Sequence, residues 1–403
     1  MIKRIWVHNY KSLRGVTVKL DPLTVLIGRS GSGKSNLVDG IRFLRQYLTT
    51  RSHGFVPQIE WPRIMCRTAQ DSILHFTVEL TLPGYEPDLT YRLALGPPPS
   101  AQLPAPARFG IDYQPFVTEE SLVTSGNRVL YQQSDGKWDE QPEVADVPAP
   151  GQLALGVVYG IPEAQLAYQF LTKGIGCYDF PSDVLRARTP TPFAPPVPQN
   201  SKVVVGLEDD GANYLRVFEL IAENVSDPST LKEILAGLRK LNPSVTTIDL
   251  ETIRRDDILV GHRIGGQPPV LTLGLGQESE GFRRFLAHLL ALYQLPAKQT
   301  LVFEEPEKGI YPGALEALAS YLKIAAAKRS QIILTTHNPL MLDHFDVEQI
   351  RVVDMPGFET RIGRVVPDQI QSIRQELMGT GELLTVDEAR TDSSSTEPAG
   401  ALS

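Results

Sequence analysis

The segment that most restricts the fold of this chain is a short loop rich in glycine. Residues 28–35 read Gly-Arg-Ser-Gly-Ser-Gly-Lys-Ser and match the pattern G-x-x-x-x-G-K-[ST] at every fixed position. An apolar run with β-branched residues precedes the loop at 23–27, and apolar residues at helical spacing follow it. A strand, a glycine loop and a helix in this order aim backbone N–H groups and a helix N-terminus at a phosphate group.

Each residue type in the loop has a task in such a site. Glycine allows positive φ and a close approach of the backbone. Lys34 supplies a point charge for the β- and γ-phosphates, and the Ser35 hydroxyl can ligate Mg²⁺. We therefore predict a nucleotide site formed by the consecutive residues Gly28, Arg29, Ser30, Gly31, Ser32, Gly33, Lys34, Ser35 and Asn36.

Composition places the chain among soluble globular proteins. Its 403 residues, 42% hydrophobic and 21% charged, leave room for one large domain with insertions or for two domains. No apolar run has the length of a membrane helix, and the first residues lack the features of a signal peptide. Cys66 and Cys177 fit no metal spacing and indicate a reducing compartment, so we expect a cytoplasmic protein without a membrane partner.

Five parts of the chain differ in pattern. Residues 1–96 form the expected N-terminal lobe of an ATPase, with the glycine loop and with strand patterns at 72–80 and 89–95 joined by a turn at Pro83-Gly84. Residues 97–200 are proline-rich with short strand patterns and are expected as an insertion. The rest divides into a helical lid, an α/β C-terminal lobe and a disordered tail, over 201–250, 251–385 and 386–403.

A second apolar strand pattern, which begins at Thr300, ends in carboxylates. Glu304, Glu305 and Glu307 follow its apolar residues. Ligands bind at the carboxyl ends of strands in open α/β sheets. We assign Glu304 to the Mg²⁺ shell and Glu305 to the orientation or deprotonation of the attacking water. The alternative is an exposed acidic loop after a strand, and the glycine loop favours the catalytic assignment.

Two further polar clusters stand at element ends in the C-terminal lobe. His337 follows an apolar strand pattern at 331–335, which comes after a helical pattern at 315–327. This order predicts a parallel sheet in which His337 lies beside the Glu304 strand, near a γ-phosphate. Ser279 and Gly281 begin an amphipathic helix, and on spacing alone an ordinary N-cap without a ligand is the favoured interpretation of Ser279.

Taken in order, these motifs resemble an ABC-type ATPase of the SMC, RecF and Rad50 branch, and more closely the stand-alone RecF-like or OLD-like "AAA family ATPase" proteins. The segments at 5–13 and 210–215 also fit that pattern. The resemblance covers residues 1–50 and about 205–365, and leaves out the insertion. It implies an α/β P-loop NTPase fold with an ABC/SMC-like head, an N-terminal antiparallel β subdomain and a helical lid.

The same resemblance implies an ATP-hydrolysing enzyme that uses Mg²⁺ and works as a head-to-tail homodimer. Lys34 of one copy would face the signature residues Ser279, Glu280 and Gly281 of the other. Glu305 becomes the hydrolytic base and His337 the switch histidine.

Two positions depart from the family pattern. Ser30 stands where relatives often carry Asn, and Tyr311-Pro312 stands where they often show His-Pro. A glutamine that couples the γ-phosphate to the insertion is also implied, and Gln58 and Gln70 are both candidates.

The expected partner is DNA or a separately encoded effector nuclease, in DNA repair or phage defence. OLD-type nucleases carry a metal-binding acidic domain after the ATPase core, and here about 20 residues follow the last core-like segment, so we expect no nuclease in this chain. The net charge of −8 argues against a surface that binds nucleic acid over its whole extent but allows a local basic face. Candidates for that face are Arg254, Arg255, Arg351, Arg361, Arg364 and Arg374.

Two other classes of protein also contain a phosphate-binding loop of this pattern. An ABC transporter motor would carry its acidic strand much closer to the loop than Glu304 is to Lys34. A GTPase or small-molecule kinase would leave His337 and the signature unused, and the chain has no Asn-Lys-x-Asp segment that reads guanine.

Overall fold

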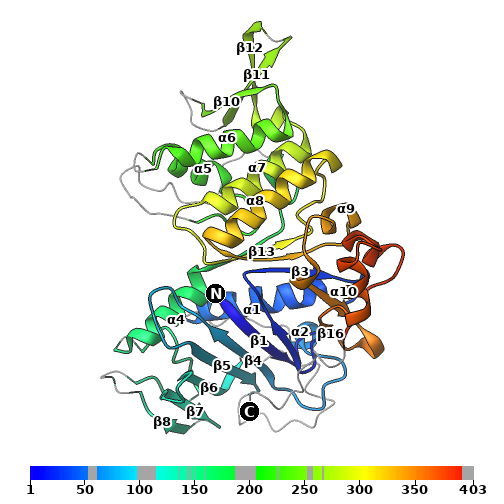
Figure 1. Ribbon diagram of the computed structural model, residues 1–403. Coiled ribbons are helices and arrows are strands. Elements are labelled where there is room, and N and C mark those ends of the chain that lie inside the picture. The colour runs from blue at the N-terminus through cyan, green and yellow to red at the C-terminus, as the bar shows by residue number, and fades with distance from the viewer. Residues whose placement is uncertain are drawn as a thin grey trace. The chain divides into compact units, whose positions relative to one another are not determined.

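A computed structural model describes residues 1–52, 61–97, 115–135, 137–142, 144, 147–149, 151–158, 160–186, 206–224, 227–251, 257–265 and 267–392 (Figure 1). Close packing divides the chain into two units. The first unit joins Met1–Ile175 to Asp346–Ser403, and the second unit is Gly176–Phe345.

A seven-stranded antiparallel sheet dominates the first unit, with strand order β2-β1-β4-β5-β6-β7-β8. Its strands are β1 (Ile2–His8), β2 (Val16–Lys19), β4 (Leu74–Leu80), β5 (Leu89–Gly96), β6 (Phe116–Thr124), β7 (Val129–Ser134) and β8 (Lys137–Glu140). The predicted β4–β5 hairpin is confirmed: Leu80 pairs with Leu89, and Gly84 in the turn has φ +71°.

Strand β6 continues the N-terminal sheet across the expected boundary at residue 97. It pairs with β5 over nearly its whole length. Tyr91 on β5, Leu122 on β6 and Tyr131 on β7 are all fully buried, so one apolar layer spans these strands. The strands of the expected insertion therefore extend the lobe that contains the glycine loop, although the domain limits themselves stay a prediction.

A second set of strands in the first unit carries the glycine loop. β3 (Leu23–Ile27) is buried at all five positions and runs parallel to β15 (Ile350–Asp354), with Ile27 opposite Val352. β16 (Arg361–Gly363) is antiparallel to β15. Helices of the unit are α1 (Lys34–Ser52), α2 (Trp61–Ile64), α4 (Pro162–Lys173) and α10 (Pro367–Arg374), with 3-10 turns η4 (Val347–Gln349), η5 (Pro356–Phe358) and η6 (Thr380–Leu384).

Part of the expected disordered tail lies among the described residues. Residues 386–392 lie against α10 and β16: the backbone N–H of Asp392 donates to Arg364 O at 2.8 Å, and that of Val366 donates to Arg390 O at 3.1 Å. These backbone bonds hold a segment that has few apolar side chains, and the limits of the tail stay a prediction. The remainder of the tail, 393–403, lies outside the described residues.

Helices and short sheets alternate in the second unit. α5 (Tyr214–Ala222) and α6 (Ser229–Leu241) confirm the expected helical pair, and they pack with α7 (Glu280–Tyr293) and α8 (Leu315–Lys328), as Figure 1 shows. β13 (Thr300–Glu304) and β14 (Gln331–Thr335) are parallel, with Glu304 opposite Thr335, which confirms the predicted arrangement. β9 (Ile175–Tyr178) begins at Ile175, which still belongs to the first unit, and its other residues belong to the second unit. The shorter elements are η1 (Val184–Arg186), η2 (Leu275–Gln277), η3 (Pro312–Ala314) and α9 (Pro339–Leu342).

A three-stranded antiparallel sheet stands between α6 and α7 in the sequence. It contains β10 (Val245–Leu250), β11 (Ile258–Ile264) and β12 (Gln267–Gly274). The first two strands were predicted. β12 was not, because Pro268 and Pro269 interrupt its pattern and proline is disfavoured within a sheet. Among the described residues, no helix is both long and apolar enough to span a membrane.

Candidate nucleotide site

The glycine loop between β3 and α1 has the backbone that the motif demands. Gly28, Gly31 and Gly33 all have positive φ, at +149°, +78° and +101°. A Cβ on Gly28 would lie 2.1 Å from the Val353 carbonyl oxygen, and a Cβ on Gly33 would lie 2.0 Å from Thr360 Oγ1. Positive φ and crowding together therefore restrict both outer positions to glycine.

Positive charge and unused polar atoms gather in this loop. Lys34 Nζ donates to the carbonyl oxygens of Gly28, at 2.6 Å, and Arg29, at 3.0 Å, so its ammonium group lies within the loop. Ser32 Oγ is buried and has no hydrogen-bond partner in the structure. Ser35 at the start of α1 is exposed. A phosphate group fits this donor set, because it brings acceptors for the lysine and for the orphaned hydroxyl.

A turn from the far end of the chain supports the loop. The backbone N–H of Thr360 donates to Ser12 O at 2.8 Å, and the two hydroxyls lie 2.6 Å apart. Asn36 Nδ2 donates to Ser12 Oγ at 2.6 Å, while Thr360 Oγ1 donates to Ser32 O at 3.3 Å. Ser12 and Thr360 were not predicted in this role, because hydroxyl residues far apart in the chain carry no local signal.

Glu359 strengthens the same turn. Its Oε1 accepts from Arg14 Nη1 at 2.6 Å and from Thr68 Oγ1 at 2.9 Å. The hydrogen bond from Arg14 is the main reason that the pKa of Glu359 lies below its usual range. The carboxylate therefore stays ionised and links three loops of the first unit.

In the second unit, β13 and β14 bring Glu305 and His337 together. Glu305 Oε1 lies 3.1 Å from His337 Nδ1, and the side chains are 37% and 62% exposed. The Glu305 backbone has φ +46°, which is uncommon for a residue with a side chain. It is held there by its N–H, which donates to both Thr335 O and Thr335 Oγ1 at 3.1 Å. A carboxylate in a strained, fixed backbone and within reach of solvent is suited to act on a water molecule.

Glu307 positions the turn that carries His337. Its side chain is buried, and Oε1 accepts from Thr336 Oγ1 at 2.6 Å, while Thr336 Oγ1 also accepts from the Asn338 backbone N–H at 3.0 Å. Glu307 Oε2 is buried without a hydrogen-bond partner among the described residues, and burial raises the pKa of this carboxyl. This role of Glu307 depends on its contact with Thr336, which the acidic run in the sequence does not indicate.

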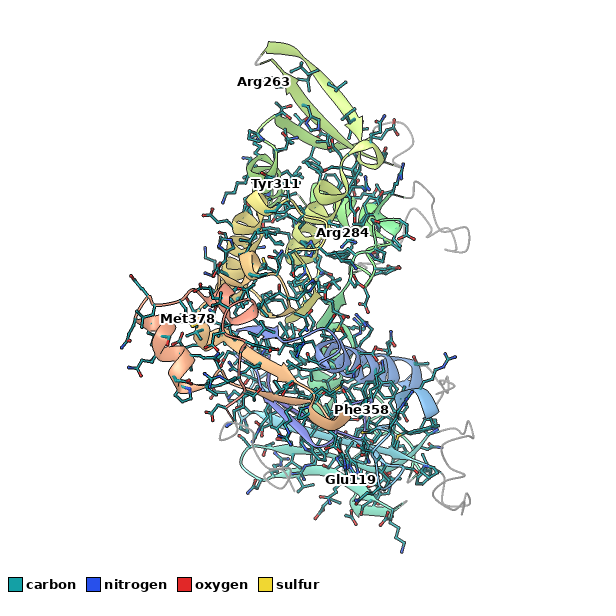
Figure 2. The ribbon with its side chains drawn as sticks, turned by 90° about the vertical axis from the view of Figure 1, so that its right-hand side faces the viewer. Glu119, Arg263, Arg284, Tyr311, Phe358 and Met378 are labelled. Atoms are coloured by element: carbon teal, nitrogen blue, oxygen red, sulfur yellow. The ribbon has the colours of Figure 1, made fainter. Side chains whose placement is uncertain are left out.

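Ser279 is the N-cap of α7. Its Oγ accepts from the Phe282 backbone N–H at 3.2 Å, which leaves the hydroxyl hydrogen available to another acceptor. A Cβ on Gly281 would lie 2.7 Å from Gly309 O, so this glycine packs against the loop that follows β13. Tyr311 in that loop is 74% exposed (Figure 2).

The predicted site residues thus form two groups. Gly28 to Asn36 lie in the first unit, whereas Glu304, Glu305, His337 and the signature residues lie in the second. Gln58 falls outside the described residues, Gln70 is exposed after α2, and the coupling glutamine stays a prediction with both candidates open. Within the described ranges, no group of three or more His, Cys, Asp and Glu side chains could hold a metal ion. A Mg²⁺ site of one hydroxyl, one carboxylate and substrate phosphates, as expected for Ser35 and Glu304, needs no such group.

The basic residues considered for DNA differ in exposure. Arg351 is 3% exposed and pairs with Asp21, so it contributes nothing to a solvated basic surface. Arg361, Arg364 and Arg374 are exposed, and Arg374 pairs with Glu348. Arg254 and Arg255 lie outside the described residues.

Comparison with known proteins agrees with these observations. The model of the family described as "AAA domain, putative AbiEii toxin, Type IV TA system" matches residues 23–125 and 208–343, more than half of the chain. None of the curated protein sequences matches.

Solved structures show the fold. An Smc head bound to the C-terminal winged-helix domain of ScpA has a TM-score of 0.54 and 13% identity, over 92% of this chain and 99% of that chain. The SMC head domain from Thermotoga maritima has a TM-score of 0.46 and 13% identity, over 91% and 99%. An Smc head with an extended coiled coil, bound to the C-terminal domain of ScpA derived from Pyrococcus furiosus, has a TM-score of 0.48 and 14% identity, over 93% and 99%. The first of these confirms the predicted fold class, an α/β P-loop NTPase with an SMC-like head.

Proposed function

The chain belongs to the AAA-domain family whose model it matches, and we propose on that basis that it binds and hydrolyses ATP. Its family and fold are those of an ATPase of the SMC and RecF type. The observation that carries the proposal is the pairing of Glu305 with His337 at the carboxyl ends of two parallel strands, in a chain that also holds a phosphate-binding loop.

The loop residues perform the binding step. Backbone N–H groups of residues 29–35 and the Lys34 ammonium hold the β- and γ-phosphates, and Ser32 Oγ finds in a phosphate oxygen the partner it lacks. Ser35 and Glu304 are the residues that would hold Mg²⁺, which when bound neutralises charge on the phosphate oxygens.

Glu305 and His337 perform the hydrolytic step. The Glu305 carboxylate orients the attacking water and accepts its proton as the bond from the water oxygen to the γ-phosphorus forms and the bond from the γ-phosphorus to the bridging oxygen breaks, with ADP as the leaving group. His337 Nδ1, 3.1 Å from Glu305 Oε1, fixes the carboxylate and can hydrogen-bond the phosphate side of the site through its other nitrogen. The hydrogen bond from Thr336 Oγ1 to Glu307 Oε1 holds the turn that contains His337 beside the loop that contains Glu305.

The proposed active form is a head-to-tail homodimer. Ser279, Glu280 and Gly281 of one copy would contact the γ-phosphate held by Lys34 of the other. The N-terminus of the 14-residue helix α7 and the free hydrogen of Ser279 Oγ suit an anion.

We further propose that this cycle of ATP binding and hydrolysis acts on DNA or on a partner effector nuclease. DNA binding that does not weaken as salt rises would contradict contacts with the DNA phosphates.

Two substitutions test the core of the proposal. Lys34→Ala is expected to abolish ATP binding, because the phosphate charge loses its counter-charge. Glu305→Gln is expected to keep ATP affinity and to lower turnover by about 10²- to 10⁴-fold, the usual contribution of a general base. Glu316→Gln is the matched control, since Glu316 is an exposed residue on α8 of the same unit. Turnover that survives Lys34→Ala would refute the proposal.

A further inference from the structure

A chain of four polar side chains leads from the end of α6 to the residue before the signature serine. Ser244 Oγ donates to Asn242 Oδ1 at 2.8 Å and lies 2.9 Å from His262 Nδ1. On the other side of the ring, His262 Nε2 lies 2.6 Å from Glu278 Oε1. The His262 and Glu278 side chains are only 9% and 8% exposed.

The hydrogen-bond inventory of these side chains fixes the direction of the bond to Glu278. A carboxylate can only accept, so His262 Nε2 donates to Glu278 Oε1. On the other side of the ring, the donor and acceptor roles of His262 Nδ1 and Ser244 Oγ follow the ring tautomer. His262 therefore links Ser244 to Glu278 through a nearly buried pair of side chains.

The hydrogen bond between His262 and Glu278 holds the segment that leads into α7. Glu278 has ψ 161°, so its side chain and that of Ser279 leave an extended backbone in different directions. The Glu278 carbonyl oxygen accepts from Arg283 Nη1, and the backbone N–H of Leu275 donates to Asp257 Oδ1 at 3.2 Å. Asp257 and His262 both anchor the segment 274–279, and His262 contacts Glu278, the residue directly before Ser279.

We propose that His262 is a positioning residue for the signature loop. Through Glu278 it fixes the conformation in which Ser279 and the first turn of α7 meet the γ-phosphate bound to a second copy. Its own hydrogen bonds are to Ser244 and Glu278, and through them it couples the β10–β12 sheet to hydrolysis. This inference rests on the proposed function, in which Ser279 acts in trans.

Two isosteric substitutions separate the two bonds of the ring. The amide nitrogen of Gln reaches the place of His Nε2, whereas that of Asn reaches the place of Nδ1. His262→Gln therefore keeps the donor to Glu278, and His262→Asn keeps only the contact with Ser244. A role in packing alone would affect both variants alike.

The expected results differ between the two variants. His262→Asn lowers kcat by about 10- to 100-fold with little change in the KM for ATP, because a misplaced group loses transition-state contacts and not substrate affinity. His262→Gln stays within about threefold of wild type. Equal kcat values for the two variants, or an unchanged kcat for His262→Asn, would overturn the proposal.

A second readout keeps this test separate from that of the proposed function. Amide hydrogen exchange of residues 274–283 is expected to speed up in His262→Asn but not in His262→Gln. Wild-type protein without ATP turnover would refute the proposed function, and the exchange comparison would still decide whether His262 orders the loop. If His262→Asn does not fold, Glu278→Leu takes its place, because leucine has no acceptor for His262 Nε2: a fall in kcat at constant KM supports the proposal, and an unchanged kcat contradicts it.

Discussion

Three glycines of the phosphate loop share a left-handed backbone but differ in their surroundings. The Cβ of a residue at 28 would meet the β15 backbone at 2.1 Å, whereas nothing lies within 4 Å of a Cβ at position 31. A backbone carbonyl in a paired strand cannot move aside as the end of a side chain can. Positive φ therefore accounts for all of the loss of stability expected from a side chain at position 31. At position 28 it accounts for only a part of that loss.

We expect Gly28→Ala to lower the free energy of unfolding by about 2–4 kcal/mol and to abolish ATP binding. Gly31→Ala, with strain but no clash, is expected to cost about 1 kcal/mol. Chemical denaturation of the two variants measures the difference. Equal losses would show that the contact with β15 relaxes freely.

Glu307 gives a prediction for pH. Burial raises the pKa of this carboxyl in the folded protein, so the unfolded chain loses the proton first as pH rises. Stability from this group is therefore full below the unfolded pKa and is lost as pH rises through the folded pKa. Glu307→Gln removes the titrating carboxyl and therefore removes this loss of stability at higher pH.

The expected measurement is a melting temperature that falls less steeply in Glu307→Gln than in wild type as pH rises above the unfolded pKa of a glutamate and through the raised folded pKa of Glu307. Glu316→Gln should keep the wild-type slope, because Glu316 is exposed. A slope that is the same in wild type and Glu307→Gln would mean that the buried carboxyl titrates as in the unfolded chain.

Local pattern decided which site residues could be predicted. The phosphate loop, Glu304, Glu305 and His337 stand at element ends within short runs, so the sequence alone identified them. Ser12, Thr360, Glu307 and His262 act through contacts with residues distant in the chain, and their types are common in any surface loop. Only the folded backbone brings such pairs together.

At the scale of elements, Glu120 on β6 ties together neighbouring strands and a loop. It is fully buried and accepts five hydrogen bonds, from donors at 2.7–3.3 Å. The donors are the hydroxyls of Tyr91 and Tyr131, the amide of Gln133 and the backbone N–H groups of Ala154 and Leu155. Burial raises the pKa of Glu120, and these donors oppose that shift.

Glu120→Gln is expected to lower the free energy of unfolding by about 2–4 kcal/mol, because the amide group replaces an acceptor where every neighbour donates. Glu119→Gln is the matched control on the next residue (Figure 2), and we expect it to stay within about 0.5 kcal/mol of wild type. Urea denaturation measures both. A neutral result for Glu120→Gln would mean that the donors find other acceptors.

Most helices and strands could also be predicted from the sequence, because their patterns are local. β1 to β5, α5 to α8 and the parallel pair β13–β14 have clear periodicity and turn residues. β12 carries two prolines, and the described part of the tail, 386–392, is held by backbone bonds to 364 and 366. Neither feature is visible in local apolar patterning.

At the scale of the whole molecule, the proposed site requires parts of two copies. Lys34→Ala and Ser279→Ala are each expected to be inactive alone. Mixed in equal amounts, they should recover about one quarter of the wild-type activity, because half of the dimers are mixed and each holds one of two sites. Specific activity of the wild type should also rise with protein concentration. No recovery on mixing would mean that both residues act within one copy.

The support of the phosphate loop by Ser12 and Thr360 has a consequence for biosynthesis. The second unit is continuous, so it can fold as soon as residue 345 has left the ribosome. The first unit is divided, and its N-terminal part waits for β15, Glu359 and Thr360, which are made after the whole of the second unit. A nascent chain halted before these residues already carries every motif for nucleotide chemistry, yet its loop lacks the strand that packs against Gly28. Competence to bind nucleotide should therefore arise only after Thr360 has been made.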